Sequence, residues 1–205
     1  MRWFTADLHF GHENIIKFCD RPFRDLNHMH TTIIDNINHL VGQEDELWIL
    51  GDLAMGLLAN TLPITKRIIG KVHLVAGNHD RVHPYSGAMK SENMIPTYME
   101  LANLESLNRT NTSLTLLNGV PVEVSHFPYS IEVKRSHKED KFAKWRLIDE
   151  GQWLLHGHTH GSWRMLGKQI DVGIDAWGGY PVSEDTLIKL MEDGSRNLDK
   201  IAWVL

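Results

Sequence analysis

The first half of the chain alternates between short apolar runs and amphipathic helical patterns, and this alternation restricts the possible fold strongly. Residues 2–5, 46–50 and 71–76 form runs that are typical of buried β-strands. Between these runs, residues 25–41 and 61–69 have the apolar spacing that predicts helices. Strand–helix–strand order requires parallel strands joined by helical crossovers, so we predict an α/β fold.

The second half has a different pattern, which favours antiparallel pairs. Residues 113–124 alternate around Asn118-Gly119, a dipeptide typical of a hairpin turn. Residues 162–172 form a second candidate hairpin around Gly167-Lys168, and residues 152–155 read as a further strand. We also expect helices over residues 136–148 and 183–191 and a closing strand over residues 200–205.

The composition limits the classes of protein to consider. The chain has 205 residues, which suits one domain over residues 1–205, and its formal net charge is -5. An acidic chain disfavours an extended nucleic-acid surface. Its one cysteine allows neither a disulfide framework nor a thiolate zinc site. We find no signal peptide and no segment that could span a bilayer, so we expect a cytoplasmic protein without membrane contact.

Polar clusters follow the predicted strands. Asp7 and His9 follow the first strand, Asp52 follows the second, and Asn78 follows the third. The carboxyl ends of parallel strands meet at one edge of a sheet, so these side chains should lie together. Later strands are followed by His126, His158 and His160. Such mixed oxygen and nitrogen ligands suit Mn, Fe, Zn or Ni, and two ions roughly 3.5–4 Å apart would clamp a phosphoryl group.

Five motifs resemble, in order and separation, the signature of the calcineurin-like metallophosphoesterases. They are Asp7-x-His9, Gly51-Asp52, Gly77-Asn78-His79-Asp80, Ser125-His126 and Gly157-His158-x-His160. The opening of the chain is similar to the short bacterial and bacteriophage phosphodiesterase-type branch of that family. The resemblance implies one domain, a four-layer α/β/β/α sandwich in which helices flank two mixed sheets.

The resemblance also implies the ligands of two divalent ions, with Mn²⁺ expected and Fe, Zn or Ni as alternatives. One ion would be held by Asp7, His9 and His160, and the other by Asn78, His126 and His158, with Asp52 bridging both. The implied reaction is hydrolysis of small phosphodiesters, cyclic nucleotides among them, by in-line attack of a metal-bridging hydroxide.

His79 is the implied catalytic residue, an imidazole that binds no metal and protonates the leaving alkoxide. A histidine suits this task because its pKa lies near working pH. Either Asp80 or Asp175 could orient this imidazole through a hydrogen bond.

Three further residues have two readings each. His12 either contacts the substrate phosphate or caps the helix that begins near Asn14. Arg81 either binds a phosphate oxygen or is a solvated loop arginine. Trp177 either walls a base-sized pocket or anchors its glycine-rich loop.

The substrate class follows from a departure from the family pattern. Members that act on phosphoproteins continue Gly-Asp with Val-Asp-Arg-Gly, whereas this chain has Leu53-Ala54-Met55-Gly56 after Asp52. The missing arginine favours a small phosphoester as the partner of the site. The alternatives are a phosphomonoesterase, a nucleotide pyrophosphohydrolase, a nuclease or a non-catalytic metal-binding module.

Overall fold

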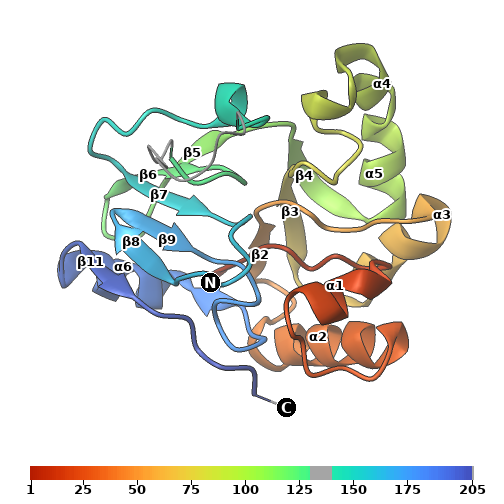
Figure 1. The fold of residues 1–205 in the computed structure, drawn as a ribbon, viewed down its shortest axis with the longest axis horizontal. Coiled ribbons are helices and arrows are strands. Elements are labelled where there is room, and N and C mark those ends of the chain that lie inside the picture. The colour runs from red at the N-terminus through yellow and green to blue at the C-terminus, as the bar shows by residue number, and fades with distance from the viewer. Residues whose placement is uncertain (130–139, 205) are drawn as a thin grey trace.

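Two β-sheets face each other in the computed structural model, which describes residues 1–129 and 140–204 (Figure 1). The strand order of the first sheet is β10 (Val182–Ser183), β1 (Arg2–Thr5), β2 (Glu46–Ile49), β3 (Lys71–Val75) and β4 (Leu104–Asn108). Strands β1 to β4 run parallel, and β10 is antiparallel to β1. The predicted parallel pairing of the three N-terminal strands is therefore confirmed.

The second sheet is also mixed. Its order is β11 (Arg196–Leu198), β8 (Met165–Gly167), β9 (Gln169–Asp171), β7 (Trp153–His156), β6 (Pro121–Val124) and β5 (Thr112–Thr115). Strands β6, β7 and β9 are parallel, whereas β5, β8 and β11 pair antiparallel. Both predicted hairpins are present, as β5–β6 and β8–β9. The chain thus has the predicted α/β fold with two mixed sheets and helices.

The helices lie mainly on the outer side of the first sheet (Figure 1). They are α1 (Glu13–Phe18), α2 (Leu26–Leu40), α3 (Leu58–Thr61), α4 (Ala88–Asn93), α5 (Ile95–Leu101) and α6 (Glu184–Glu192). Asp25 caps α2 by accepting a hydrogen bond from the His28 N–H. The apolar face of α2 packs with Leu47 and Leu74 of the first sheet in one buried cluster. No helix in the described part of the chain has the length and apolarity to cross a bilayer.

A second buried cluster fills the space between the sheets. Phe4 and Leu50 come from the first sheet and the loop after it, and Leu155 and Ile170 come from the second. Helix α6 adds Leu187 to the same cluster. Because this core holds the two sheets face to face, loops that leave both sheets at the same edge can meet.

Three predicted elements differ from the structure. In place of the helix predicted over residues 61–69, the chain forms the short α-helix α3 from Leu58 and then the 3₁₀ helix η1 (Leu62–Arg67). The α-helix does not continue because Pro63 has no N–H to donate. Of the helix predicted over residues 136–148, residues 136–139 lie outside the described residues, and the rest contains only the 3₁₀ turn η3 (Ala143–Trp145).

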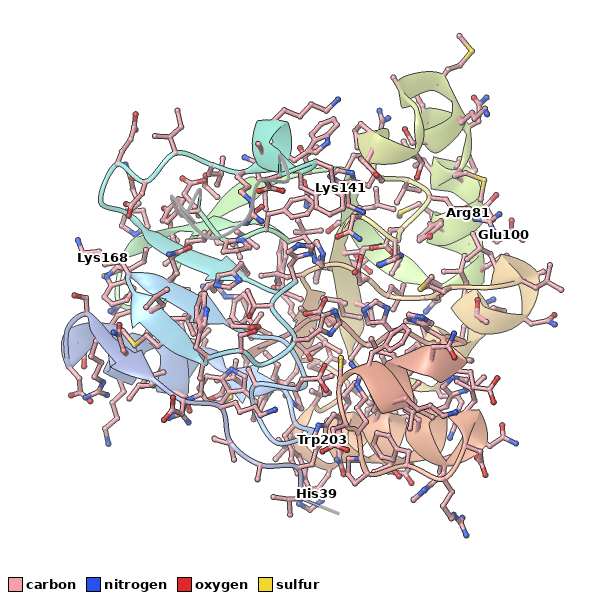
Figure 2. The ribbon with its side chains drawn as sticks, viewed as in Figure 1. His39, Arg81, Glu100, Lys141, Lys168 and Trp203 are labelled. Carbon is pink, nitrogen blue, oxygen red and sulfur yellow. The ribbon has the colours of Figure 1, made fainter. Side chains whose placement is uncertain are left out.

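The closing strand predicted over residues 200–205 is wrong. Residue 205 lies outside the described residues. Among those described, the last strand is β11, which ends at Leu198, and Ile201 forms only an isolated bridge with Trp177. The apolar residues that suggested a strand pack elsewhere. The Trp203 ring lies 5.1 Å from the Phe23 ring, centroid to centroid, on the side of the molecule that carries α2 (Figure 2).

Candidate metal centre

The residues predicted to bind metal lie in loops that follow strands of both sheets, at the same edge of the molecule. Asp7 follows β1, and its N–H donates to the Gly51 carbonyl at 3.0 Å, while the His9 N–H donates to the Asp52 carbonyl at 2.9 Å. A bond between the sheets closes the arrangement, because the His158 N–H donates to Asp7 Oδ2 at 2.9 Å. Backbone bonds therefore join the loops that follow β1 and β2, and the Asp7 carboxylate joins them to the loop that follows β7.

Most of the predicted ligands have an unusual backbone conformation. The φ angle is positive at Asp7 (60°), His9 (53°), Asp52 (54°), His158 (72°) and His160 (48°). Elsewhere in the described chain, only Asp20 and Asn103 share this property among residues other than glycine. A positive φ is unfavourable for such residues, and this conformation clusters at functional sites. It turns these side chains toward one another.

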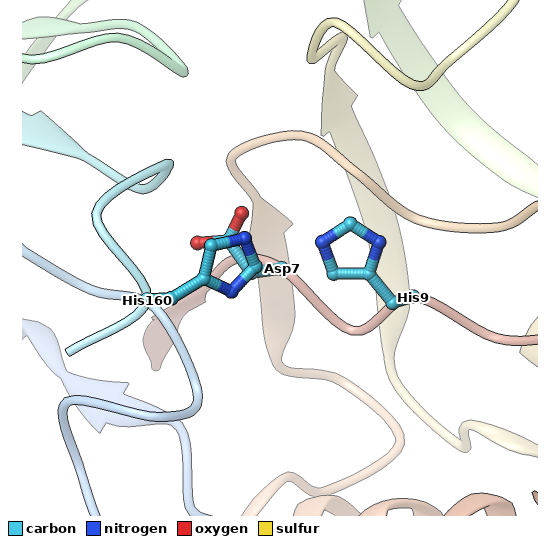
Figure 3. A group of neighbouring side chains, drawn as sticks. All are labelled: Asp7, His9 and His160. Carbon is cyan, nitrogen blue, oxygen red and sulfur yellow. The ribbon is translucent and has the colours of Figure 1, made fainter. Parts of the chain in front are cut away.

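Asp7, His9 and His160, here called the first donor group, offer ligand atoms that all lie within 4.8 Å of one another. Figure 3 shows the three side chains gathered in one place, although they come from two separate loops. The rings of His9 and His160 are stacked with their centroids 5.0 Å apart.

Asn78, His126 and His158, the second donor group, lie on the other side of Asp52. His126 Nε2 is 3.1 Å from Asn78 Oδ1 and 3.3 Å from His158 Nδ1. The Asp52 carboxylate lies between the two groups, because its Oδ2 is 3.5 Å from His126 Nε2 and 3.6 Å from His9 Nε2. The structure thus brings together all seven residues predicted to bind metal.

Several donor atoms of this centre have no partner within the described residues. Asp7 Oδ1, Asp52 Oδ2 and both ring nitrogens of His9 are buried and make no hydrogen bond. Burying polar atoms without partners is costly, and native proteins seldom do so without a reason. A divalent cation would satisfy the carboxylate oxygens and an imidazole nitrogen together, so the donor set fits a metal centre.

Two histidines are oriented by bonds on their far side. His126 Nδ1 lies 2.8 Å from the Leu50 carbonyl, and His160 Nδ1 lies 3.2 Å from Asp175 Oδ2. Each contact keeps a proton on Nδ1, so Nε2 is the nitrogen that would coordinate a metal ion. Metal-binding histidines are commonly held in this way.

The carboxylates of the centre favour positively charged groups beside them. Although burial opposes ionisation, His126 and His9 lower the pKa of Asp52 well below its ordinary value. Burial likewise opposes charge on His126, but Asp52 outweighs it and raises the pKa of this imidazole to about 9. For His160, Asp7 and Asp175 outweigh burial and raise the pKa to about 11. Positive charge is therefore favoured beside these carboxylates, and bound metal ions would provide it.

The other donors respond mainly to burial. Burial raises the pKa of Asp7 and lowers that of His9. Burial, together with the charge on His126, lowers the pKa of His158 to about 2. His9 and His158 are therefore neutral, which is the form that binds metal.

Arg21 supports the first donor group, and the sequence analysis did not identify it. This buried arginine binds Asp175 through two bonds, Nε to Oδ1 at 2.9 Å and Nη2 to Oδ2 at 2.8 Å. It also donates to the backbone carbonyls of Asp7 at 2.6 Å and Leu8 at 3.2 Å. Although burial opposes ionisation, Arg21 lowers the pKa of Asp175 to about 2. No motif surrounds Arg21, so the sequence offers no signal for this role.

Neither carboxylate that was predicted to orient His79 contacts its ring in the described structure. Asp175 is bound to Arg21 and His160 instead. Asp80 accepts hydrogen bonds from the N–H groups of Gly77 and Asp52, both at 2.8 Å, and of Leu53 at 3.1 Å. Burial and the nearby Asp52 raise the pKa of Asp80 to about 7. Asp80 therefore holds the backbone of two ligand-bearing loops, which corrects the predicted role.

His79 lies at the open side of the centre. Its side chain is 40% exposed, and its ring Nε2 is 4.0 Å from Asp52 Oδ2. The backbone N–H of His79 donates to Asp52 Oδ1 at 2.9 Å. His12 lies nearby, with its ring centroid 5.2 Å from that of His9 and 6.1 Å from that of His79. His12 precedes α1 but makes no side-chain capping bond. This position favours the prediction that His12 contacts the substrate phosphate over the prediction that it caps the helix.

Arg81 and Trp177 do not join the centre in the described structure. Arg81 is exposed and donates to the Gly56 carbonyl at 3.3 Å, as expected of a loop arginine. Trp177 Nε1 donates to the Asp171 carbonyl at 2.7 Å, and the Arg164 guanidinium lies 4.9 Å from its ring centroid. Of the two readings of Trp177, these contacts favour the loop anchor over the wall of a base-sized pocket.

Comparisons with known proteins show which relatives the chain has. No family model matches it. It is 34% identical over 199 residues to the Gene 66 protein of Mycobacterium phage L5, which covers 92% of this chain and 93% of that protein. It is 36% identical over 184 residues to the Gene 66 protein of Mycobacterium phage D29, with 85% and 88% covered.

Two further proteins with lower sequence identity also match nearly the whole chain. An uncharacterized protein of Methanocaldococcus jannaschii is 25% identical over 201 residues, with 94% of this chain and 92% of that protein covered. The crystal structure of a protein of unknown function from Aquifex aeolicus matches with a TM-score of 0.64 at 24% identity. That match covers 93% of this chain and 98% of the other, and it supports the fold alone.

Proposed function

The chain belongs to the family of the mycobacteriophage Gene 66 proteins, and we propose that it is a metal-dependent phosphoesterase that hydrolyses small phosphodiesters. One observation carries the proposal. Carboxylate, carboxamide and imidazole groups converge from loops of both sheets, and several of their buried donor atoms have no partner in the described structure. This arrangement agrees with the resemblance of the five motifs to the calcineurin-like metallophosphoesterases.

The finer fold forms part of the proposal. Two mixed sheets that face each other, with helices along the outer side of the first, are compatible with the four-layer α/β/β/α sandwich of that family (Figure 1). The donors lie where the strands of such a sheet end, which is where ligands bind in open parallel sheets.

Two divalent ions are proposed as the cofactors, with Mn²⁺ as the expected metal. The first donor group would hold one ion, the second donor group would hold the other, and Asp52 would contact both. When bound, such ions activate water as a nucleophile and stabilise the charge that develops on the phosphoryl oxygens. The chain contributes the rigid positions of the donors, through the hydrogen bonds of Asp80 and of the pair Arg21–Asp175.

His79 is proposed as the general acid. Its ring is partly open to solvent and lies beside Asp52, so a substrate held at the centre would be within reach of Nε2. Protonation of the leaving oxygen by this imidazole would avoid release of an alkoxide. His12, on the same open side, is positioned to donate a hydrogen bond to a phosphoryl oxygen.

The proposal is tested with protein loaded with Mn²⁺ and a bis-aryl phosphodiester. We expect turnover that a chelator abolishes. Asp52→Asn should lower kcat/KM by about 10³-fold or more, because it removes a charge from the point between the two ions. Asp35→Asn, at an exposed position of α2, is the matched control and should retain activity. Full activity in Asp52→Asn, or activity that survives chelation, would contradict the proposal.

A substrate panel and metal analysis separate the remaining alternatives. Rates on a monoester, a diester, a dinucleoside polyphosphate and DNA rank the phosphomonoesterase, phosphodiesterase, pyrophosphohydrolase and nuclease activities. Two bound ions with no turnover of any of these esters would instead indicate a non-catalytic metal-binding module.

A further inference from the structure

An exposed aromatic side chain stands at the rim of the candidate centre. Phe18 is the last residue of α1 and is 75% exposed. Its ring is inclined at 75° to the ring of His12, with the centroids 6.2 Å apart. Because three quarters of the side chain is exposed, much of this aromatic surface is open to solvent near His12. Such a face offers a stacking surface to a planar ligand.

A pocket of about 370 Å³ adjoins this ring. Its walls include Phe18, Cys19, Asp20, His160, Ser162 and Lys200. A second hollow of about 420 Å³ shares Cys19, Asp20 and Lys200 and continues toward Trp203. These volumes suit a small organic ligand. Because His160 belongs both to the first donor group and to the pocket wall, the pocket opens directly beside the metal centre.

The polar groups of the pocket match the edges of a nucleobase. The exposed side chains of Asp20 and Lys200 line the pocket, so a carboxylate and an ammonium group offer an acceptor and donors. The Ser162 hydroxyl donates to the Thr159 carbonyl at 2.8 Å, which leaves its lone pairs as acceptors. A flat ring with donors and acceptors along its edge can stack on Phe18 and form hydrogen bonds with these groups, whereas an aliphatic alcohol cannot stack.

We infer that this pocket binds the nucleoside part of the phosphoester, with the base stacked on Phe18. The inference rests on the proposed function, because a phosphate held at the donor groups would leave its ester group beside His160, which lines the pocket. It makes Phe18 a residue that determines specificity for nucleotides over other phosphoesters.

The test compares two inhibitors that share a phosphate and a sugar but differ in the base. Inhibition constants of adenosine 5′-monophosphate and ribose 5-phosphate are measured against hydrolysis of the bis-aryl diester. The wild type should bind the nucleotide about 5- to 100-fold more tightly, which is the range for stacking of one base. Phe18→Ala should reduce this ratio at least about fivefold, and Phe18→Trp should preserve it. Leu57→Ala, which removes another exposed apolar side chain far along the sequence, is the matched control and should preserve the ratio.

A second measurement does not depend on hydrolysis. Saturation-transfer NMR with metal-free protein should detect the adenine protons of adenosine in the wild type and in Leu57→Ala but not in Phe18→Ala. An equal ratio of inhibition constants in the wild type and Phe18→Ala, or an adenine signal that survives Phe18→Ala, would overturn the pocket. If no ester is hydrolysed but the Phe18-dependent signal appears, the proposed function fails and the nucleoside pocket stands.

Discussion

Arg21 shows how a single side chain can stabilise a site that it does not enter. Its guanidinium binds both oxygens of Asp175 and two backbone carbonyls, including that of Asp7. Asp175 in turn contacts His160, so the ion pair acts on two members of the first donor group. A planar fork of donors makes these contacts together, which a lysine cannot reproduce. Arg21 is therefore a positioning residue.

Arg21→Lys is expected to weaken both folding and metal binding. Loss of the fork leaves Asp175 partly unpaired in a buried site, which should lower the free energy of unfolding by about 2–4 kcal/mol. The affinity for Mn²⁺ should fall roughly 10- to 100-fold, because Asp175 no longer orients His160. Chemical denaturation and isothermal titration of Mn²⁺ measure the two effects separately.

The control for this prediction is an arginine on the surface. Arg196 pairs with Asp193 at 3.0 Å, and both side chains are partly exposed. Such pairs contribute about 0–1 kcal/mol, so Arg196→Lys should change neither quantity measurably. An Arg21→Lys protein that binds Mn²⁺ as tightly as the wild type would refute the positioning role.

At the scale of elements, glycines permit the loops after the strands to approach the ligands. A Cβ at Gly157, which follows β7, would lie 2.5 Å from Ala6 Cβ and 2.8 Å from Asp7 Oδ2. A Cβ at Gly77, which follows β3, would lie 2.3 Å from Asp52 Oδ1. The glycines in these two motifs are therefore required by close packing between loops of different strands.

Gly157→Ala should disturb the centre through this contact. Relief of the overlap requires movement of Asp7 or of the loop after β7, with an expected loss of about 1–3 kcal/mol in unfolding free energy. Binding of Mn²⁺ should weaken in parallel, as titration calorimetry can measure. Gly42→Ala is the control, since the atom nearest to its new Cβ would be Asp45 Oδ2 at an ordinary 3.5 Å. Equal metal affinity in Gly157→Ala and Gly42→Ala would argue against the role of this contact.

At the scale of the whole molecule, the candidate centre lies where the two sheets meet. Asp7, Asp52 and Asn78 follow strands of the first sheet, and His126, His158 and His160 follow strands of the second. Ions bound by both sets would link the sheets at this edge, while the buried cluster links them along their faces. Metal binding at the candidate centre should therefore stabilise the fold.

Addition of Mn²⁺ to the metal-free protein should raise its Tm. At a free concentration of about 100 times Kd, a site present only in the folded state adds about 2.7 kcal/mol. For a chain of this length, each kcal/mol corresponds to roughly 2–4 °C. Differential scanning calorimetry with and without a chelator measures the shift, and Asp52→Asn should reduce it. A Tm that is the same with Mn²⁺ and with chelator would exclude a metal centre that joins the sheets.

The amino-acid sequence was sufficient to predict the order of the N-terminal strands, both hairpins and the residues that converge at the candidate centre. Apolar periodicity and turn residues act over short distances, so β1, β2, β3 and α2 are readable within a few residues of their true bounds. The convergence of Asp7, Asp52 and Asn78 was readable because parallel strands bring their carboxyl ends to one edge, whereas the full set of seven ligands came from the resemblance of the five motifs. The metals and the catalytic role of His79 stay predictions for the experiments above.

The support of the centre depends on tertiary contacts. Arg21 pairs with Asp175, and Asp80 accepts hydrogen bonds from the N–H groups of Asp52 and Leu53, which are distant from it in sequence. The same holds for the packing of Trp203 on Phe23, which replaced the expected last strand. Local patterns carry no record of such contacts, because burial and hydrogen bonding between separate loops select the final partner of each polar group.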